Sequence, residues 1–153
     1  MNLLPAFKLF TIYIFSIFYI SVGIAHFWMT EKFMIIIPDI FPFPLFLVLL
    51  SGFFEITLGV LLLIKKYRSY ACFGLVILLI AVFPANIYLY IDEGARNLYG
   101  NISQLDALVR MFFQFPLIIL AYWHGRILSP KWFDYFCCYL SIPTIFYFSW
   151  ILV

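Results

Sequence analysis

The stretch that decides the fold runs from Pro42 to Ile64 and reads PFPLFLVLLSGFFEITLGVLLLI. Its only ionisable residue is Glu55, and Gly52 and Gly59 lie three and four residues away from it. A helix rises about 1.5 Å per residue, so a segment of this length crosses a hydrocarbon core of about 30 Å. Steps of three and four residues return to one helix face. The pattern therefore predicts a membrane-spanning helix that turns its carboxyl and two glycines toward a neighbouring helix.

The composition of the whole chain indicates an integral membrane protein. Of its 153 residues, 67% are hydrophobic and only 10% are charged, and the mean hydropathy is +1.11. A soluble domain carries about 25% charged residues, so this chain lacks the polar side chains to cover a surface in water. The length suits one domain. The net charge of +2 is too small and too scattered for nucleic acid binding, so the expected partner is the lipid bilayer.

Further apolar runs predict an all-α transmembrane helix bundle. They cover residues 9–29, 70–91, 108–126 and 132–153. We expect residues 1–128 to form a four-helix core and residues 129–153 to add a fifth C-terminal helix. That last segment either spans the membrane or lies along its interface. The segments 30–41 and 92–105 are predicted to be loops.

The distribution of cations predicts which end of the bundle faces the cytoplasm. With the N-terminus inside, the inner segments hold six cations and the outer segments hold three. Because lysine and arginine are enriched on the cytoplasmic side, we expect a cytoplasmic N-terminus. The inner set is Lys8, Lys65, Lys66, Arg68, Arg126 and Lys131, and the outer set is Lys32, Arg96 and Arg110.

Polar residues from four separate spans are predicted to lie in the outer half of the membrane. Counting the rise per residue from Phe43 places Glu55 about 18 Å deep, and the others lie nearer the outer boundary. We expect a polar pocket that opens outward, with an almost purely apolar inner half below it. The candidate ligand-binding residues are His26, Ser51, Glu55, Asn86, Arg110 and Gln114.

Glu55 is the most informative of these residues. A charged side chain at the centre of a spanning helix costs about 2.5–3.5 kcal/mol on insertion scales, so it needs a partner inside the bundle. Two states remain open. Either the carboxylate is ionised and paired with Arg110, or it is protonated and hydrogen-bonded to Ser51, Asn86 or Gln114. An alternative interpretation is that Glu55 and Arg110 only hold two helices in register.

No metal site is predicted, and no cofactor is required. His26 and His124 are expected at opposite ends of the bundle, where they cannot share one metal ion. The three cysteines, Cys72, Cys137 and Cys138, include no C-x-x-C pair. No catalytic residue set is evident either, so we expect no intrinsic enzymatic activity.

Several of these residues also carry a resemblance to a known family. Over residues 10–124 the pattern resembles the DoxX-like family of small integral membrane proteins. Thr30 and Phe112 depart from it, because proline is expected at both positions. The matching residues are His26, Phe27, Phe33, Pro38, Pro42, Pro44, Val48, Ser51, Gly52, Glu55, Gly59, Gly74, Leu75, the run AVFPAN from Ala81 to Asn86, Arg110 and Gln114. The resemblance implies a four-helix core in a bacterial inner membrane and an association with quinone-coupled redox systems.

These observations lead to one expected function and two alternatives. The first is an accessory protein whose outward pocket binds a quinone-like molecule for a membrane or extracytoplasmic oxidoreductase. An aromatic content of 23% suits a flat ligand. The second is a small proton-coupled carrier that uses Glu55 as its proton site. The third is a structural or assembly factor with no ligand.

Overall fold

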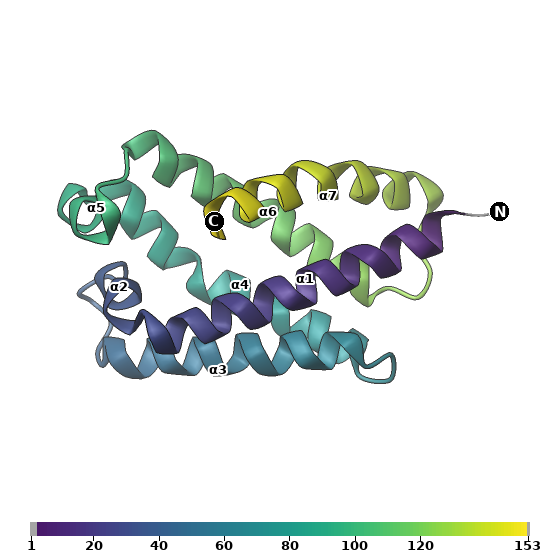
Figure 1. Cartoon of the computed structure of the whole chain (residues 1–153), viewed down its shortest axis with the longest axis horizontal. Coiled ribbons are helices and arrows are strands. Elements are labelled where there is room, and N and C mark those ends of the chain that lie inside the picture. Colours follow the sequence, from purple (N-terminus) through teal and green to yellow (C-terminus); the bar gives the residue numbers. More distant parts are fainter. Residues whose placement is uncertain (1–2, 153) are drawn as a thin grey trace.

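The computed structural model describes residues 3–152, and over this range the chain is all-α, as predicted. Figure 1 shows the long helices lying roughly along one axis, with the two short ones at one end. They are α1 (Leu3–Trp28), α2 (Thr30–Ile35), α3 (Pro44–Leu63), α4 (Arg68–Ile91), α5 (Glu93–Gly100), α6 (Gln104–Gly125) and α7 (Lys131–Leu152).

Four of the helices, α1, α3, α4 and α6, are long and apolar enough to cross a membrane. Their bounds agree with the four predicted core spans to within a few residues, except that α1 begins six residues earlier than expected. The start of α6 is set by a capping box, in which the Ser103 hydroxyl and the Asp106 carboxylate each accept a bond from the other residue's backbone N–H. The protein is an integral membrane protein with a helical bundle.

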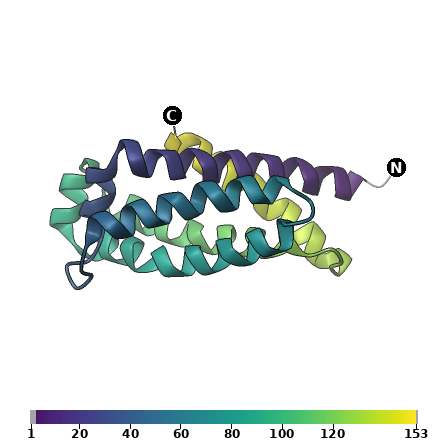
Figure 2. The ribbon, with the colours of Figure 1, turned by 90° about the horizontal axis from the view of Figure 1, so that it is seen from below.

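The bundle is built from two closely packed helix pairs, α1 with α3 and α4 with α6. Figure 2 shows α1 and α3 running side by side. Helices α3 and α4 approach each other at the turn that joins them and diverge toward α2 and α5 (Figure 1). At the narrow end, a Cβ atom added to Gly74 would lie 2.7 Å from Cδ2 of Leu58. The two pairs are therefore in contact at one end and separated toward the other.

Glycines allow α1 and α3 to approach closely. A Cβ atom added to Gly52 would lie 2.6 Å from Cβ of His26, and one added to Gly23 would lie 2.8 Å from the carbonyl oxygen of Gly52. Further along the same contact, Ser16 Oγ donates a 2.6 Å hydrogen bond to the carbonyl of Gly59. Small residues at such contacts are how helices associate in lipid, where dispersion rather than the hydrophobic effect acts between them.

The two segments predicted as loops contain the short helices α2 and α5. The Asp92 carboxylate caps α5 by accepting a 2.6 Å bond from the N–H of Ala95, and Asn101 ends it in the left-handed conformation with φ 54°. Arg96 is buried and donates a 2.6 Å bond to the carbonyl of Tyr90. Helices α2 and α5 contact each other across the end of the bundle that was predicted to open outward.

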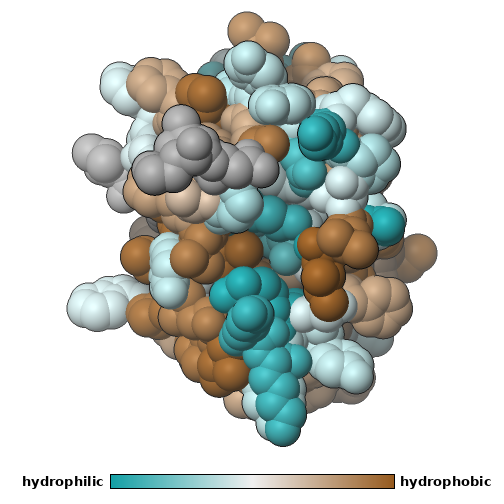
Figure 3. Space-filling model, turned by 90° about the vertical axis from the view of Figure 1, so that its right-hand side faces the viewer, coloured by the Kyte–Doolittle hydropathy of each residue, from teal (hydrophilic) through white to brown (hydrophobic). Residues whose placement is uncertain are grey.

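The opposite end of the bundle carries the start of α1, the α3–α4 turn and the α6–α7 loop, and thus the six cations predicted to lie together. Figure 3 shows hydrophilic side chains gathered on this face. Polar groups also lie inside this end. The Thr11 hydroxyl is 3.0 Å from Nε2 of His124, and Lys8 donates a 2.9 Å bond to the carbonyl of Arg126. The prediction of an almost purely apolar inner half is therefore wrong.

Helix α7 runs antiparallel to α6 along the bundle axis. At one end the Trp123 indole N–H donates a 2.7 Å bond to the Asp134 carboxylate, and at the other the ring of Tyr147 stacks on Phe113 with centroids 3.9 Å apart. The fifth C-terminal helix is therefore present. It is not among the four helices that meet the length and hydropathy criteria for a span, so its crossing of the membrane stays a prediction.

We predict that Gly52→Ala lowers the free energy of unfolding by about 1–3 kcal/mol, because the added methyl group overlaps His26 and pushes α1 away from α3. The measurement is unfolding of the detergent-solubilised protein with increasing SDS. Gly94→Ala is the control, because its added methyl group meets only a side-chain oxygen of Asp92, at 3.2 Å. Equal stability of the two variants would contradict the role given to the α1–α3 contact.

Candidate functional site

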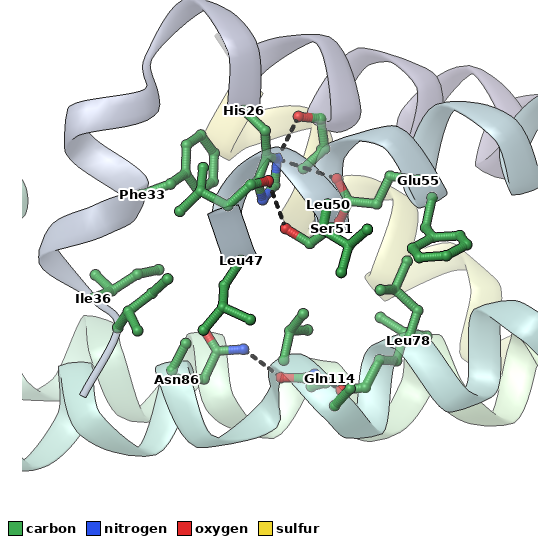
Figure 4. Close-up of a pocket in the computed structure, with 18 of the residues that line it drawn as sticks. His26, Phe33, Ile36, Leu47, Leu50, Ser51, Glu55, Leu78, Asn86 and Gln114 are labelled. Atoms are coloured by element: carbon green, nitrogen blue, oxygen red, sulfur yellow. Dashed lines mark hydrogen bonds and ion pairs between the residues drawn. The ribbon is translucent and has the colours of Figure 1, made fainter. Parts of the chain in front are cut away.

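A cavity of about 740 Å³ lies between the α1–α3 pair and the α4–α6 pair. All six residues predicted as ligand-binding line it: His26, Ser51, Glu55, Asn86, Arg110 and Gln114. Figure 4 shows that they form two groups that face each other, with His26, Ser51 and Glu55 on one side and Asn86 and Gln114 on the other. The site therefore has two polar walls contributed by different helix pairs.

The first wall is organised by His26 of α1 and Glu55 of α3. Nδ1 of His26 is 3.2 Å from Oε2 of Glu55, which is the only contact within 4.0 Å between a basic and an acidic side chain in the described part of the chain. Nδ1 also lies 2.8 Å from the carbonyl oxygen of Val22, one helical turn back. Since a carbonyl can only accept, Nδ1 carries the hydrogen, and its N–H points toward Val22. This geometry leaves Oε2 of Glu55 buried and without a directed hydrogen bond.

The predicted pair of Glu55 with Arg110 is therefore wrong, and Ser51, Asn86 and Gln114 do not bond the carboxyl either in the described structure. Ser51 instead donates a 2.9 Å bond to the carbonyl of Val48. The reason is the glycine contact between α1 and α3, which brings His26 next to Glu55, whereas Arg110 is held in the opposite wall.

The ring of His26 is held in one orientation. Phe33 of α2 stacks on it with centroids 3.8 Å apart and planes 19° from parallel, and Nδ1 is engaged with Val22. The second ring nitrogen, Nε2, makes no hydrogen bond to any residue from 3 to 152. Because Nδ1 carries the hydrogen, Nε2 of the neutral ring is an acceptor beside the cavity.

The second wall is a chain of hydrogen bonds between α4, α5 and α6. The amide of Asn86 donates to Oε1 of Gln114, and Arg110 Nε donates to Oδ1 of Asn86 at 3.2 Å. Arg110 Nη1 donates to the hydroxyl of Tyr99 at 2.5 Å. Gln114 Nε2 donates to the carbonyl of Leu79, also at 2.5 Å. Every polar side chain of this wall is therefore fixed by at least one neighbour.

Two cations lie near Tyr99 at the outer end of the cavity. The guanidinium carbon of Arg110 is 5.0 Å from the centre of the Tyr99 ring, and Lys32 Nζ is 6.0 Å from it. Both residues line the cavity. Arginine has five N–H donors, so Arg110 keeps donors beyond those bonded to Asn86 and Tyr99. The cavity thus offers cationic donors on one wall and a buried acid on the other.

The remaining lining is apolar and aromatic. A cavity of this size, with mostly apolar walls and a few fixed polar groups, has the usual character of a small-molecule binding site. Within residues 3–152, no three His, Cys, Asp or Glu side chains gather in a group that could hold a metal ion. The aromatic lining residues are Phe18, Tyr19, Phe33, Phe41, Phe54, Tyr99 and Phe148.

Sequence reasoning missed Tyr99, Lys32 and Phe33. All three lie in segments predicted as loops, and they face the cavity because α2 and α5 fold over the end of the bundle. The signal for α5 was present: Asp92 is a good N-cap residue, and Gly100 with Asn101 is a typical helix end. No comparable signal marks α2.

The fold and the cavity define the class of protein: an integral membrane helical bundle with a mixed polar and apolar cavity between its spans. The chain belongs to the family described as a domain of unknown function, DUF8561, whose pattern matches residues 15–125. The matched region runs from the middle of α1 to the end of α6. No curated protein and no solved structure matches the chain.

The resemblance to the DoxX-like family is therefore wrong, because the matching family is a different one. The residues that carried the resemblance explain the error. Most are glycines at close helix contacts, prolines near helix ends and polar groups turned into the bundle, and a compact membrane bundle needs such residues whatever its family.

We predict that Gln114→Leu lowers the free energy of unfolding by about 1–3 kcal/mol, because it removes the acceptor of the half-buried Asn86 amide and the donor to the buried carbonyl of Leu79. SDS-induced unfolding measures this. The double variant with Gln114→Leu and Asn86→Leu should lose much less stability than the two single variants lose in sum, since the two side chains share one hydrogen bond. Additive costs would contradict the coupling.

Proposed function

We propose that this protein binds a small amphipathic molecule of the quinone type in the cavity between its two helix pairs. The observation that carries the proposal is the presence of two fixed polar walls facing each other across one largely apolar cavity of about 740 Å³. In this proposal the protein has no chemistry of its own.

The polar groups suit a ring with oxygen atoms at opposite edges. Arg110 has spare N–H donors for a carbonyl oxygen at one edge. At the other edge, Nε2 of neutral His26 accepts a hydrogen bond from a hydroxyl group, which suits the reduced, quinol form. The aromatic lining supplies flat surfaces for stacking, which contributes about 0.5–1.5 kcal/mol per ring pair beyond burial.

The proposed setting is a bacterial inner membrane with the N-terminus in the cytoplasm. Six cations lie at the end of the bundle that holds the N-terminus, which supports this orientation. The cavity then lies in the outer half of the membrane. The proposed partner is a membrane or extracytoplasmic oxidoreductase that uses the same quinone pool.

We predict that purified protein binds a tail-less benzoquinone and that His26→Phe weakens this binding about tenfold, the loss of roughly 1.4 kcal/mol. Phenylalanine keeps an aromatic ring beside Phe33 but removes both nitrogens. The measurement is isothermal titration of protein in detergent.

The matched control for that experiment is His124→Phe, because His124 is the other histidine of the chain and bonds Thr11 far from the cavity. Binding in this variant should equal that of the unchanged protein. Absence of quinone binding in the unchanged protein would remove the proposal.

A second candidate function is a small proton-coupled carrier, and one observation favours it. Glu55 lies near the middle of α3, is buried, borders the cavity and has an oxygen with no directed hydrogen bond. Ionisable groups at this depth commonly mark proton or substrate pathways. The nearby His26 provides a second proton-exchanging group, 3.2 Å away.

If this second function holds, proteoliposomes should take up a small amphipathic solute faster when a pH gradient is imposed, and Glu55→Gln should abolish that dependence while leaving the helices assembled. The measurement is uptake with and without the gradient. Gradient-independent uptake in the unchanged protein would exclude the carrier function and leave the binding function standing.

A further inference from the structure

We infer that the ligand of this cavity reaches it sideways from the bilayer, through an opening between α3 and α4, and that its class is an amphipath whose tail stays in lipid while its head group lies between the polar walls. This inference rests on the proposed binding function and adds the route and the tail. We call the opening the α3–α4 portal and define it by Leu50, Phe54, Ile77 and Ala81.

The portal residues both line the cavity and face outward. Leu50 is 37% exposed and Phe54 is 42% exposed on α3, and on α4 Ile77 is 52% exposed while Ala81 is also exposed. Each pair is four residues apart, so each forms a stripe along its helix. A residue that borders the cavity and is also exposed marks a place where the cavity meets the outside.

The portal lies at the depth of the hydrocarbon. Counting from the start of α3 at Pro44, Leu50 is about 9 Å and Phe54 about 15 Å into the helix. Counting from the end of α4 at Ile91, Ala81 is about 15 Å in. Every portal residue is apolar, as a surface in contact with acyl chains requires.

Two other sides of the cavity are covered by protein, and the outer end is partly covered. Toward the cationic end, the bundle has a core of fully buried side chains that includes Leu62, Leu75 and Trp123. On the side away from the portal, α7 contributes Phe148 to the lining. At the outer end, α2 and α5 contact each other, although Lys32 and Met29 are exposed there. The portal is therefore the apolar route, and the outer end is the polar one.

The size of the cavity suits the head group of such a ligand. About 740 Å³ accommodates a drug-sized ring system, within the usual range of about 300–1,000 Å³. With the head group held by Arg110 and His26, the divergence of α3 from α4 lets the tail leave toward lipid.

The test compares two probes with two variants. The probes are a tail-less benzoquinone and the same ring carrying a decyl tail, measured by scintillation proximity on protein in nanodiscs. The variants are Ala81→Trp, which fills the portal, and Ile80→Trp, its matched control. Ile80 is the preceding residue of α4 and is 58% exposed, but it does not line the cavity.

We expect Ala81→Trp to slow the association of the decyl probe by about tenfold. Association rates among variants of one site vary over about one to three powers of ten, so a change of this size is reasonable. Its effect on the tail-less probe should be at least several times smaller. Ile80→Trp should change neither rate. An equal loss for both probes in Ala81→Trp, or no loss for either, would overturn the portal.

The two proposals fail in distinguishable ways. If neither probe binds the unchanged protein, the binding function falls, and the portal falls with it. Suppose instead that both probes bind, that His26→Phe weakens the binding of both, and that Ala81→Trp affects neither. The binding site then stands and the portal is wrong. A loss in Phe41→Trp but not in Ala81→Trp would place the route at the outer end, because Phe41 borders the cavity in the loop before α3.

Discussion

The close approach of α1 and α3 is the contact on which the site depends. The backbone of Gly52 lies against the Cβ atom of His26, and any side chain there would occupy the space that the histidine needs. That single contact fixes the height of His26 relative to Glu55 and so creates the pair at 3.2 Å. The opposing wall is built differently, from hydrogen bonds among Asn86, Gln114 and Arg110. The wall with His26 and Glu55 therefore depends on close helix packing, and the opposing wall depends on hydrogen bonds between its side chains.

Hydropathy and rise per residue predict a large part of this structure. The four spans follow from length and composition, and the six cavity residues follow from their depth and their helix faces. Depth gives the height of a residue along the axis but not which helices are neighbours. Depth therefore left several partners open for Glu55, Arg110 on α6 among them, whereas its neighbour in the structure is His26 on α1. Helix adjacency was set by the glycines, whose partner helix cannot be identified from one sequence.

The short helices α2 and α5 explain a second difference between expectation and structure. The segment of α5 is polar and contains Gly94 and Gly100, and the segment of α2 contains charged residues and Pro38, which favoured loops. Both nevertheless form short helices that fold over the outer end of the bundle. Phe33 and Tyr99 thereby become part of the cavity wall. The outer end is thus partly covered by helices, while Met29, Lys32 and Phe41 line the cavity there and are exposed. The outward opening of the pocket stays a prediction.

The position of α7 has a consequence for how the protein is made. Its first turn is tied to α6 through Trp123 and Asp134, and near its other end Phe148 completes the wall of the cavity. Because translation proceeds from the N-terminus, this wall is synthesised after the four spans. A nascent bundle that ends at Gly125 therefore lacks Phe148 and the wall that α7 supplies. The cavity can be enclosed on that side only after α7 has docked against α6.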